Sequence, residues 1–214
     1  MVFSSIVFLF RFLPLFLICY FAVPQRMKNI ILLLGSLVFY AWGEPVYVVL
    51  LLFSLFSDYV HGRLIERFHG MPLAKVLLGT SLLINLSMLG FYKYADFLIQ
   101  TVNGLTGMRI PHLDLPLPIG ISFYTFQTMA YIIDVYRGEV KAQRKLLDFA
   151  VFVTMFPKLI AGPIVRYRQV EPELHSRPAD LQQISYGAKR FVAGLAKKII
   201  LADNLGLLWQ RFLL

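Results

Sequence analysis

The chain has 214 residues, of which 58% are hydrophobic and 15% are charged. A soluble domain of this length carries roughly 45–50% apolar and ~25% charged residues, so the composition excludes a water-soluble fold. The net charge of +9 does not indicate nucleic-acid binding, because the lysines and arginines lie in short loops beside apolar segments, where membrane orientation explains them. The single cysteine, Cys19, cannot form an internal disulfide.

Three apolar segments occupy the first 60 residues. Residues 4–23 lack a basic leader and a small-residue cleavage site, so we predict an uncleaved membrane helix with a kink at Pro14. Residues 29–42 are short for a crossing that needs roughly 20 apolar residues, and they require local thinning of the bilayer. Residues 46–60 form the third predicted segment.

The middle of the chain alternates between polar and apolar stretches. Residues 61–75 are predicted to be a polar loop, and residues 76–92 a fourth membrane segment. Glycines and prolines punctuate residues 93–118, which we interpret as interfacial structure rather than a span. Residues 119–136 form the fifth apolar segment.

A sixth apolar segment, residues 149–165, contains the helix breakers Pro157, Gly162 and Pro163. The loops after segments one, three and five carry two, three and four Lys/Arg, which predicts that they are cytoplasmic and that the N-terminus is outside. Residues 166–198 carry seven further Lys/Arg, although they would lie outside if every apolar segment crossed the membrane. We therefore predict that segment six enters the membrane, breaks and returns.

The predicted fold is an all-α integral membrane protein, a multi-helix transmembrane bundle with a broken, re-entrant segment near 149–165. An amphipathic stretch, residues 181–198, runs into the apolar residues 199–214. We treat residues 1–214 as part of one membrane domain.

Polar side chains at membrane depth are the first candidates for a functional site. Asn85, Gln127, Asp134 and Lys158 lie in apolar surroundings, where such groups face protein or a watery cavity. Asp134 is equally consistent with an interfacial ion pair to Arg137. Lys158 either snorkels to the interface or lines a cavity.

Helical spacing places Tyr124, Gln127 and Tyr131 on one face, which is more typical of a core than of a site. Candidates for a general base are the four histidines, which the pattern places in polar loops: His61, His69, His112 and His175. His175 and Asp180 fit an H-x4-D spacing, which chance explains. Ser122 is not in a nucleophile elbow, and no metal-ligand spacing occurs.

Three ordered stretches carry a resemblance to a known family. They are residues 1–10 with 39–42, residues 117–127 with 131–137, and residues 156–167, followed by 194–203. Together they resemble the membrane-bound O-acyltransferases, in the bacterial branch that acetylates the exopolysaccharide alginate. Members of that family are about twice as long, so the resemblance is to an N-terminal half, and the missing C-terminal half would supply the catalytic histidine. No residue of this chain is assigned a catalytic role.

The resemblance implies a multi-pass protein of the bacterial inner membrane, with no bound cofactor. The acyl donor would be acetyl-CoA or an acyl carrier, and the acceptor an exported polysaccharide reached through extracytoplasmic partner proteins. The candidates for chamber lining or for the structural motif are Tyr124, Gln127, Asp134, Pro157, Lys158, Gly162, Pro163 and Arg166. Arg166 either attracts an anionic donor or marks the cytoplasmic side. A channel or transporter fragment, and a non-catalytic membrane scaffold, stay open as alternatives.

Overall fold

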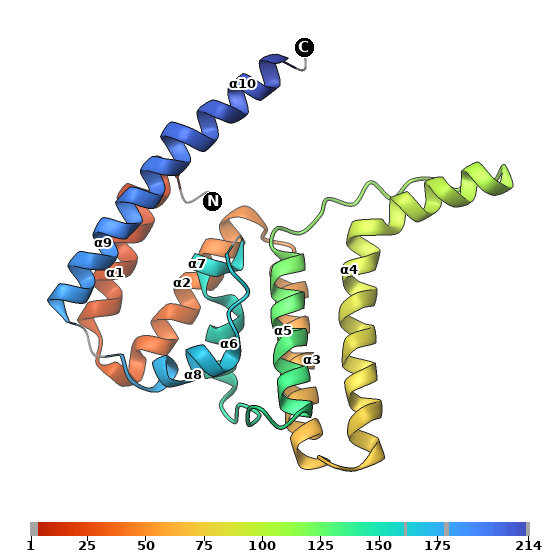
Figure 1. Cartoon of the computed structure of the whole chain (residues 1–214), viewed down its shortest axis with the longest axis horizontal. Coiled ribbons are helices and arrows are strands. Elements are labelled where there is room, and N and C mark those ends of the chain that lie inside the picture. The colour runs from red at the N-terminus through yellow and green to blue at the C-terminus, as the bar shows by residue number, and fades with distance from the viewer. Residues whose placement is uncertain (1–3, 161, 178–179, 213–214) are drawn as a thin grey trace.

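The computed structural model of the chain describes residues 4–160, 162–177 and 180–212. Every regular element in these ranges is a helix, and the helices are arranged as two groups followed by one long terminal helix (Figure 1). Parts of the quoted motifs lie outside the described residues: residues 1–3, Ala161, Pro178 with Ala179, and residues 213–214.

The first group begins with a hairpin of α1 (Leu13–Ala22) and α2 (Lys28–Gly43), joined by the short helical turn η2 (Gln25–Met27). A π-helical turn, η1 (Phe8–Phe12), precedes α1, and Pro14 lies in the first turn after it. Because Pro14 has no backbone N–H to donate, the helix changes its hydrogen-bond pattern there. The predicted segments 4–23 and 29–42 match this hairpin.

The second group packs α3 (Val48–Arg67), α4 (Pro72–Thr106) and α5 (Ile121–Tyr136) against one another. The predicted loop over residues 61–75 is wrong, because α3 continues to Arg67 and α4 begins at Pro72. Polar residues such as Glu66 and His61 occupy the last turns of α3 instead of a loop. In these turns Gly62 packs against the ring of Tyr131 on α5.

Residues 93–106 belong to α4, which continues to Thr106, so the first half of the predicted interfacial stretch is helical, and its place relative to the membrane stays a prediction. In Figure 1 the last turns of α4 lean away from the bundle. An extended return follows, and Asp96 binds it by accepting hydrogen bonds from the backbone N–H groups of Leu113 and Asp114. Within the described residues, α3 and α4 are the two helices that are long and apolar enough to cross a membrane.

The sixth segment is broken, as predicted. Helix α6 (Leu146–Thr154) ends before Met155, α7 (Phe156–Leu159) is a single turn, and α8 (Tyr167–His175) packs back against α6. The first break falls two residues before Pro157, because Pro157 fits only the first turn of a new helix. The second break precedes Gly162 and Pro163.

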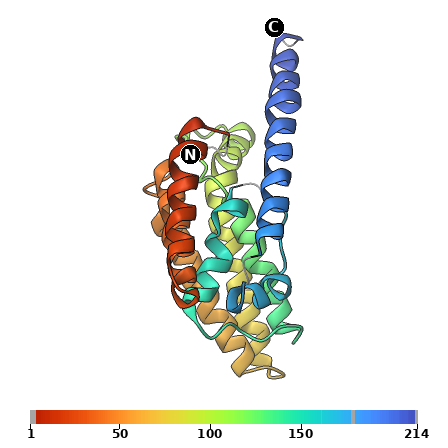
Figure 2. The ribbon, with the colours of Figure 1, turned by 90° about the vertical axis from the view of Figure 1, so that its left-hand side faces the viewer.

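Three elements form the terminal helix: α9 (Leu181–Ala196), the π-helical η3 (Lys197–Asp203) and α10 (Asn204–Phe212). Figures 1 and 2 show them as one continuous helix whose far end stands clear of the bundle. None of its residues is buried, although Leu181, Phe212 and other large apolar side chains lie along it. The predicted amphipathic and apolar stretches over residues 181–212 are therefore helical.

Candidate functional site

The break between α6 and α7 leaves backbone groups that two neighbouring helices satisfy. The side-chain amide of Gln127, on α5, donates to the carbonyl of Phe152 at 2.8 Å. The backbone N–H of Phe156 donates to the hydroxyl of Ser36, on α2, at 3.1 Å. Non-helical backbone is tolerated at membrane depth when protein groups replace the missing helix bonds in this way. Side chains of α5 and α2 therefore stabilise the break between α6 and α7.

The N-terminus of α5 lies against the end of α7. Gly120 has a left-handed φ of +79°, and a Cβ built on it would lie 2.4 Å from the carbonyl oxygen of Leu159. Only glycine permits both this conformation and this approach. The motif around Gly120 and the motif around Pro157, which are far apart in sequence, thus form one structural unit.

Lys158 turns its side chain into the protein. Its Nζ lies 4.3 Å from the centroid of the Phe152 ring, within the range of a cation–π contact. The Nζ is buried, and no hydrogen-bond partner for it is found among the described residues. Snorkelling of Lys158 to the interface, one of the two expectations, is wrong in this structure. Gly162 packs directly on the backbone of Lys158, whereas Pro157 and Pro163 are exposed.

The predicted face of α5 is buried as a unit. Tyr124, Gln127 and Tyr131 are each at most 5% exposed. Tyr131 accepts a hydrogen bond from the backbone N–H of Gln143 at 2.8 Å, whereas the hydroxyl of Tyr124 is buried with no partner in the described part of the chain. Gln127, Pro157, Lys158 and Gly162 therefore lie at the break, whereas Tyr124 lies one turn after Gly120 on α5, and a role in lining a chamber stays a prediction.

Asp134 and Arg166 lie apart from the break, near the turn that follows α5. Glu139 donates its backbone N–H to the carbonyl of Asp134 and pairs through its carboxylate with Arg166 at 3.9 Å. Arg137 also pairs with Glu139, at 3.5 Å. The expected ion pair between Asp134 and Arg137 is therefore replaced by a pair to Glu139. Because these groups are largely exposed, their electrostatic attraction is weak.

A polar network that sequence reasoning missed anchors α8 to the hairpin. Asn29 donates to the carboxylate of Asp148 at 2.7 Å and to the carbonyl of Leu174 at 3.0 Å, and Arg177 donates to Asn29. The hydroxyl of Tyr167 accepts from the side-chain amide of Gln143 at 2.8 Å, and burial raises the pKa of this hydroxyl. The start of α6 and the end of α8 thereby lie side by side, so the broken segment returns to the level where it began.

The four histidines occupy four different environments. His61 is on α3, where its ring contacts the carbonyl of Ser57 at 2.8 Å, so the expectation of a loop position is wrong. His175 is the exposed last residue of α8, so a loop position is wrong for it as well. His69 is exposed in the turn between α3 and α4, and His112 lies 3.8 Å from Asp96. Asp180 accepts from the backbone N–H of Gln182 and caps α9, which gives the second residue of the H-x4-D pattern a structural use.

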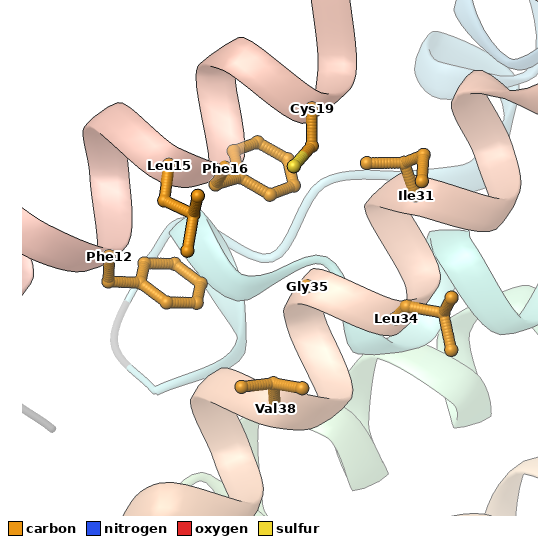
Figure 3. Close-up of a pocket in the computed structure, with 8 residues that line it drawn as sticks. All are labelled: Phe12, Leu15, Phe16, Cys19, Ile31, Leu34, Gly35 and Val38. Atoms are coloured by element: carbon orange, nitrogen blue, oxygen red, sulfur yellow. The ribbon is translucent and has the colours of Figure 1, made fainter. Parts of the chain in front are cut away.

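An apolar groove lies between α1 and α2. Figure 3 shows side chains of the two elements facing each other across it, and the sulfur of Cys19 is the only heteroatom among their side chains. The lining residues are Phe12, Leu15, Phe16, Cys19, Ile31, Leu34, Gly35 and Val38. Such a lining suits hydrocarbon rather than a polar substrate, so the groove is not the candidate site.

Comparison with known proteins finds alginate O-acetylases and a peptidoglycan O-acetyltransferase among the relatives. The chain is 42% identical over 213 residues to the probable alginate O-acetylase AlgI of Pseudomonas syringae pv. tomato, covering 97% of the chain and 41% of that protein. It is 41% identical to the probable alginate O-acetylase AlgI of Azotobacter vinelandii, covering 96% and 42%. It is 32% identical to the peptidoglycan O-acetyltransferase of Helicobacter pylori, covering 95% and 45%. No family model and no solved structure matches the chain.

These similarities extend over nearly the whole chain, although the chain spans less than half the length of each of these relatives. They include the two motifs that the structure joins at Gly120 and Leu159. The chain is therefore similar over almost its whole length to alginate O-acetylases, and it spans about two fifths of the length of those it matches.

Proposed function

We propose that the chain is the N-terminal part of a membrane O-acyltransferase that transfers acyl groups, most simply acetyl, to hydroxyls of an exported polysaccharide such as alginate. The observation that carries this proposal is the identity of 39–42% to alginate O-acetylases over 96–97% of the chain. The relation to a peptidoglycan O-acetyltransferase supports the reaction type more firmly than the acceptor.

The broken segment is the part of the chain that we assign to the passage for the donor. Broken helices at membrane depth are associated with substrate paths, because they bring backbone and polar groups to the interior of a bundle. A buried amine, on Lys158, lies at this break, and a buried phenol without a partner among the described residues, on Tyr124, lies one turn after Gly120 on α5. We assign both to the wall of the reaction chamber, where the amine would face an anionic donor such as acetyl-CoA or an acyl carrier.

The base that deprotonates the acceptor hydroxyl is assigned to the missing C-terminal half. O-acyl transfer needs a base within hydrogen-bond reach of the hydroxyl, and the histidines of this chain lie away from the break. The proposed enzyme is a multi-pass protein of the bacterial inner membrane with an extracytoplasmic N-terminus. Its polysaccharide acceptor would arrive through partner proteins on that side.

The proposal is tested in a bacterium that makes alginate but lacks its own alginate O-acetylase. One strain produces the chain alone, and another produces it fused to the remaining three fifths of the Azotobacter vinelandii relative. Ester-linked acetate on the secreted polymer is measured by NMR, with the complete relative as the positive control. We expect acetate in the fusion strain and none with the chain alone.

Two outcomes would contradict the proposal. A fusion that is inserted in the membrane but adds no acetate, while the complete relative does, would refute the assignment as an acyltransferase part. Acetylation by the chain alone would refute the assignment of the base to the missing half. The variant Lys158→Met in the fusion tests the chamber wall, since we expect lower acetylation at unchanged membrane levels.

A further inference from the structure

A cluster of buried oxygen atoms lies where α3, α4 and α5 meet. Asp58, on α3, is 0% exposed, and Ser81 and Asn85, on α4, are at most 1% exposed. The carboxylate oxygen Oδ1 of Asp58 accepts hydrogen bonds from Ser81 at 2.9 Å and from the side-chain amide of Asn85 at 2.8 Å. One oxygen of this carboxylate therefore accepts two hydrogen bonds.

Four other oxygens in this region have no hydrogen-bond partner among the described residues. They are Oδ2 of Asp58, Oδ1 of Asn85, the hydroxyl of Ser54 and the hydroxyl of Thr125. Ser54 and Thr125 are 2% and 0% exposed. A buried polar atom without a partner is destabilising, and native proteins keep few of them. The four atoms belong to three helices, α3, α4 and α5, which pack against one another.

The register of the helices brings these oxygens to one level. Gly62 contacts the ring of Tyr131, 69 residues later, and Asp58 faces the hydroxyl of Thr128, 70 residues later. Helices α3 and α5 are therefore parallel with a nearly constant offset. The same offset sets Ser54 and Asp58, one turn apart on α3, level with the turn of α5 that carries Thr125.

The charge of Asp58 is not balanced within the described part of the chain, where no lysine or arginine pairs with it. Its nearest titratable neighbour is His61, whose ring nitrogens contact the carbonyl of Ser57 and the hydroxyl of Thr80 instead. The hydroxyl of Thr128 also faces the carboxylate, but it donates to the carbonyl of Thr125 at 3.1 Å. A carboxylate inside helices of membrane length is costly unless it is paired with a positive charge or protonated.

We propose that Asp58, Asn85, Ser54 and Thr125 form a binding site for one hard monovalent cation, with Na⁺ the ion to be tested. Hard cations take oxygen ligands, and the site offers a carboxylate oxygen, an amide oxygen and two hydroxyl oxygens. A single carboxylate balances a single charge, which favours a monovalent over a divalent ion. Bound there, the ion would fasten α3, α4 and α5 together. The proposal does not depend on acyl transfer.

The test measures Na⁺ binding by the purified full chain in detergent micelles. Retention of ²²Na⁺ is followed by equilibrium dialysis, and the thermal unfolding midpoint is compared in NaCl and in choline chloride at equal ionic strength. We expect saturable retention of one ion per chain. At Na⁺ concentrations about a hundredfold above the Kd, we expect a rise in the midpoint of about 5–10 °C.

A matched pair of variants shows whether the ligands are those proposed. Thr125→Val removes one proposed ligand, and Thr154→Val makes the same change at an equally buried threonine of α6 that donates to the carbonyl of Ala150. We expect Thr125→Val to weaken Na⁺ retention about tenfold or more, and Thr154→Val to leave it unchanged. Asp58→Asn is expected to abolish it. If Asp58→Asn does not fold, the threonine pair alone decides.

Equal midpoints in the two salts together with no saturable ²²Na⁺ retention by the folded chain would overturn the proposal. An equal loss of retention in both threonine variants would overturn the ligand assignment. A variant Asp58→Asn that is more stable than the unchanged chain in every salt would show that the carboxyl of Asp58 is protonated. That result would also overturn the proposal.

Discussion

Replacing Gly120 with alanine tests how α5 and the broken segment fit together. A left-handed conformation costs a residue other than glycine roughly 1–2 kcal/mol. In addition, the new Cβ would lie 2.4 Å from the carbonyl oxygen of Leu159, so α7 must move. Overpacking of this kind costs a further ~1–3 kcal/mol. We expect Gly120→Ala to lower the free energy of unfolding by about 2–5 kcal/mol.

Gly107 provides the matched control. It also has a left-handed φ, of +70°, but a Cβ there would meet nothing within 4 Å. Gly107→Ala should therefore cost only the conformational part, roughly 1–2 kcal/mol. The assay is chemical unfolding of the full chain in mixed micelles, followed by circular dichroism. Equal losses in the two variants would refute the tight contact between Gly120 and α7.

Three further substitutions test separate contacts by the same unfolding assay. Gln127→Leu leaves the carbonyl of Phe152 without its donor and should cost about 1–3 kcal/mol, and no loss would exclude Gln127 as a support of the break. Glu139→Gln weakens the exposed ion pair to Arg166 and should lower the free energy of unfolding by less than ~1 kcal/mol. This loss should vanish in high salt, and a larger loss that salt does not change would contradict a weak surface pair. Gly79→Ala, at an open position of α4, should stabilise by about 0.5–1 kcal/mol, and a loss would show an unseen contact.

The sequence predicts best those helices whose ends coincide with the ends of an apolar run. Helix α5 and the hairpin of α1 and α2 follow the predicted ranges closely, because their apolar runs end at charged or turn-forming residues. Helices α3 and α4 extend further than predicted. Polar residues such as Glu66 and Asp96 lie beyond the apolar pattern, but both helices include them. The carboxylate of Glu66 accepts a hydrogen bond from the backbone N–H of Ala142, and that of Asp96 accepts one from Leu113.

The site was predicted in part. Pro157 and Gly162 are visible as breakers in an apolar run, and Gln127 is visible as a polar residue at membrane depth. Ser36 could not be singled out, because a serine in an apolar helix is compatible with simple packing, and only the fold brings it to Phe156. Asp58 was overlooked, although a carboxylate inside the third apolar segment is a signal that sequence alone offers.

The reversal of the chain between α6 and α8 is the central structural claim, because it makes residues 149–165 a re-entrant segment instead of a span. The structure places Arg166 beside Glu139, and His69 beside Gly138, at one end of the bundle, whereas Met108 follows α4 at the other end. The measurement is labelling of single cysteines, in a background with Cys19→Ser, by an impermeant thiol reagent applied to either membrane face.

We expect Arg166→Cys and His69→Cys to react only from the cytoplasmic face and Met108→Cys only from the opposite face. Reaction of Arg166→Cys from the same face as Met108→Cys would show that residues 149–165 cross the membrane. It would contradict both the re-entrant segment and the passage that we assign to it.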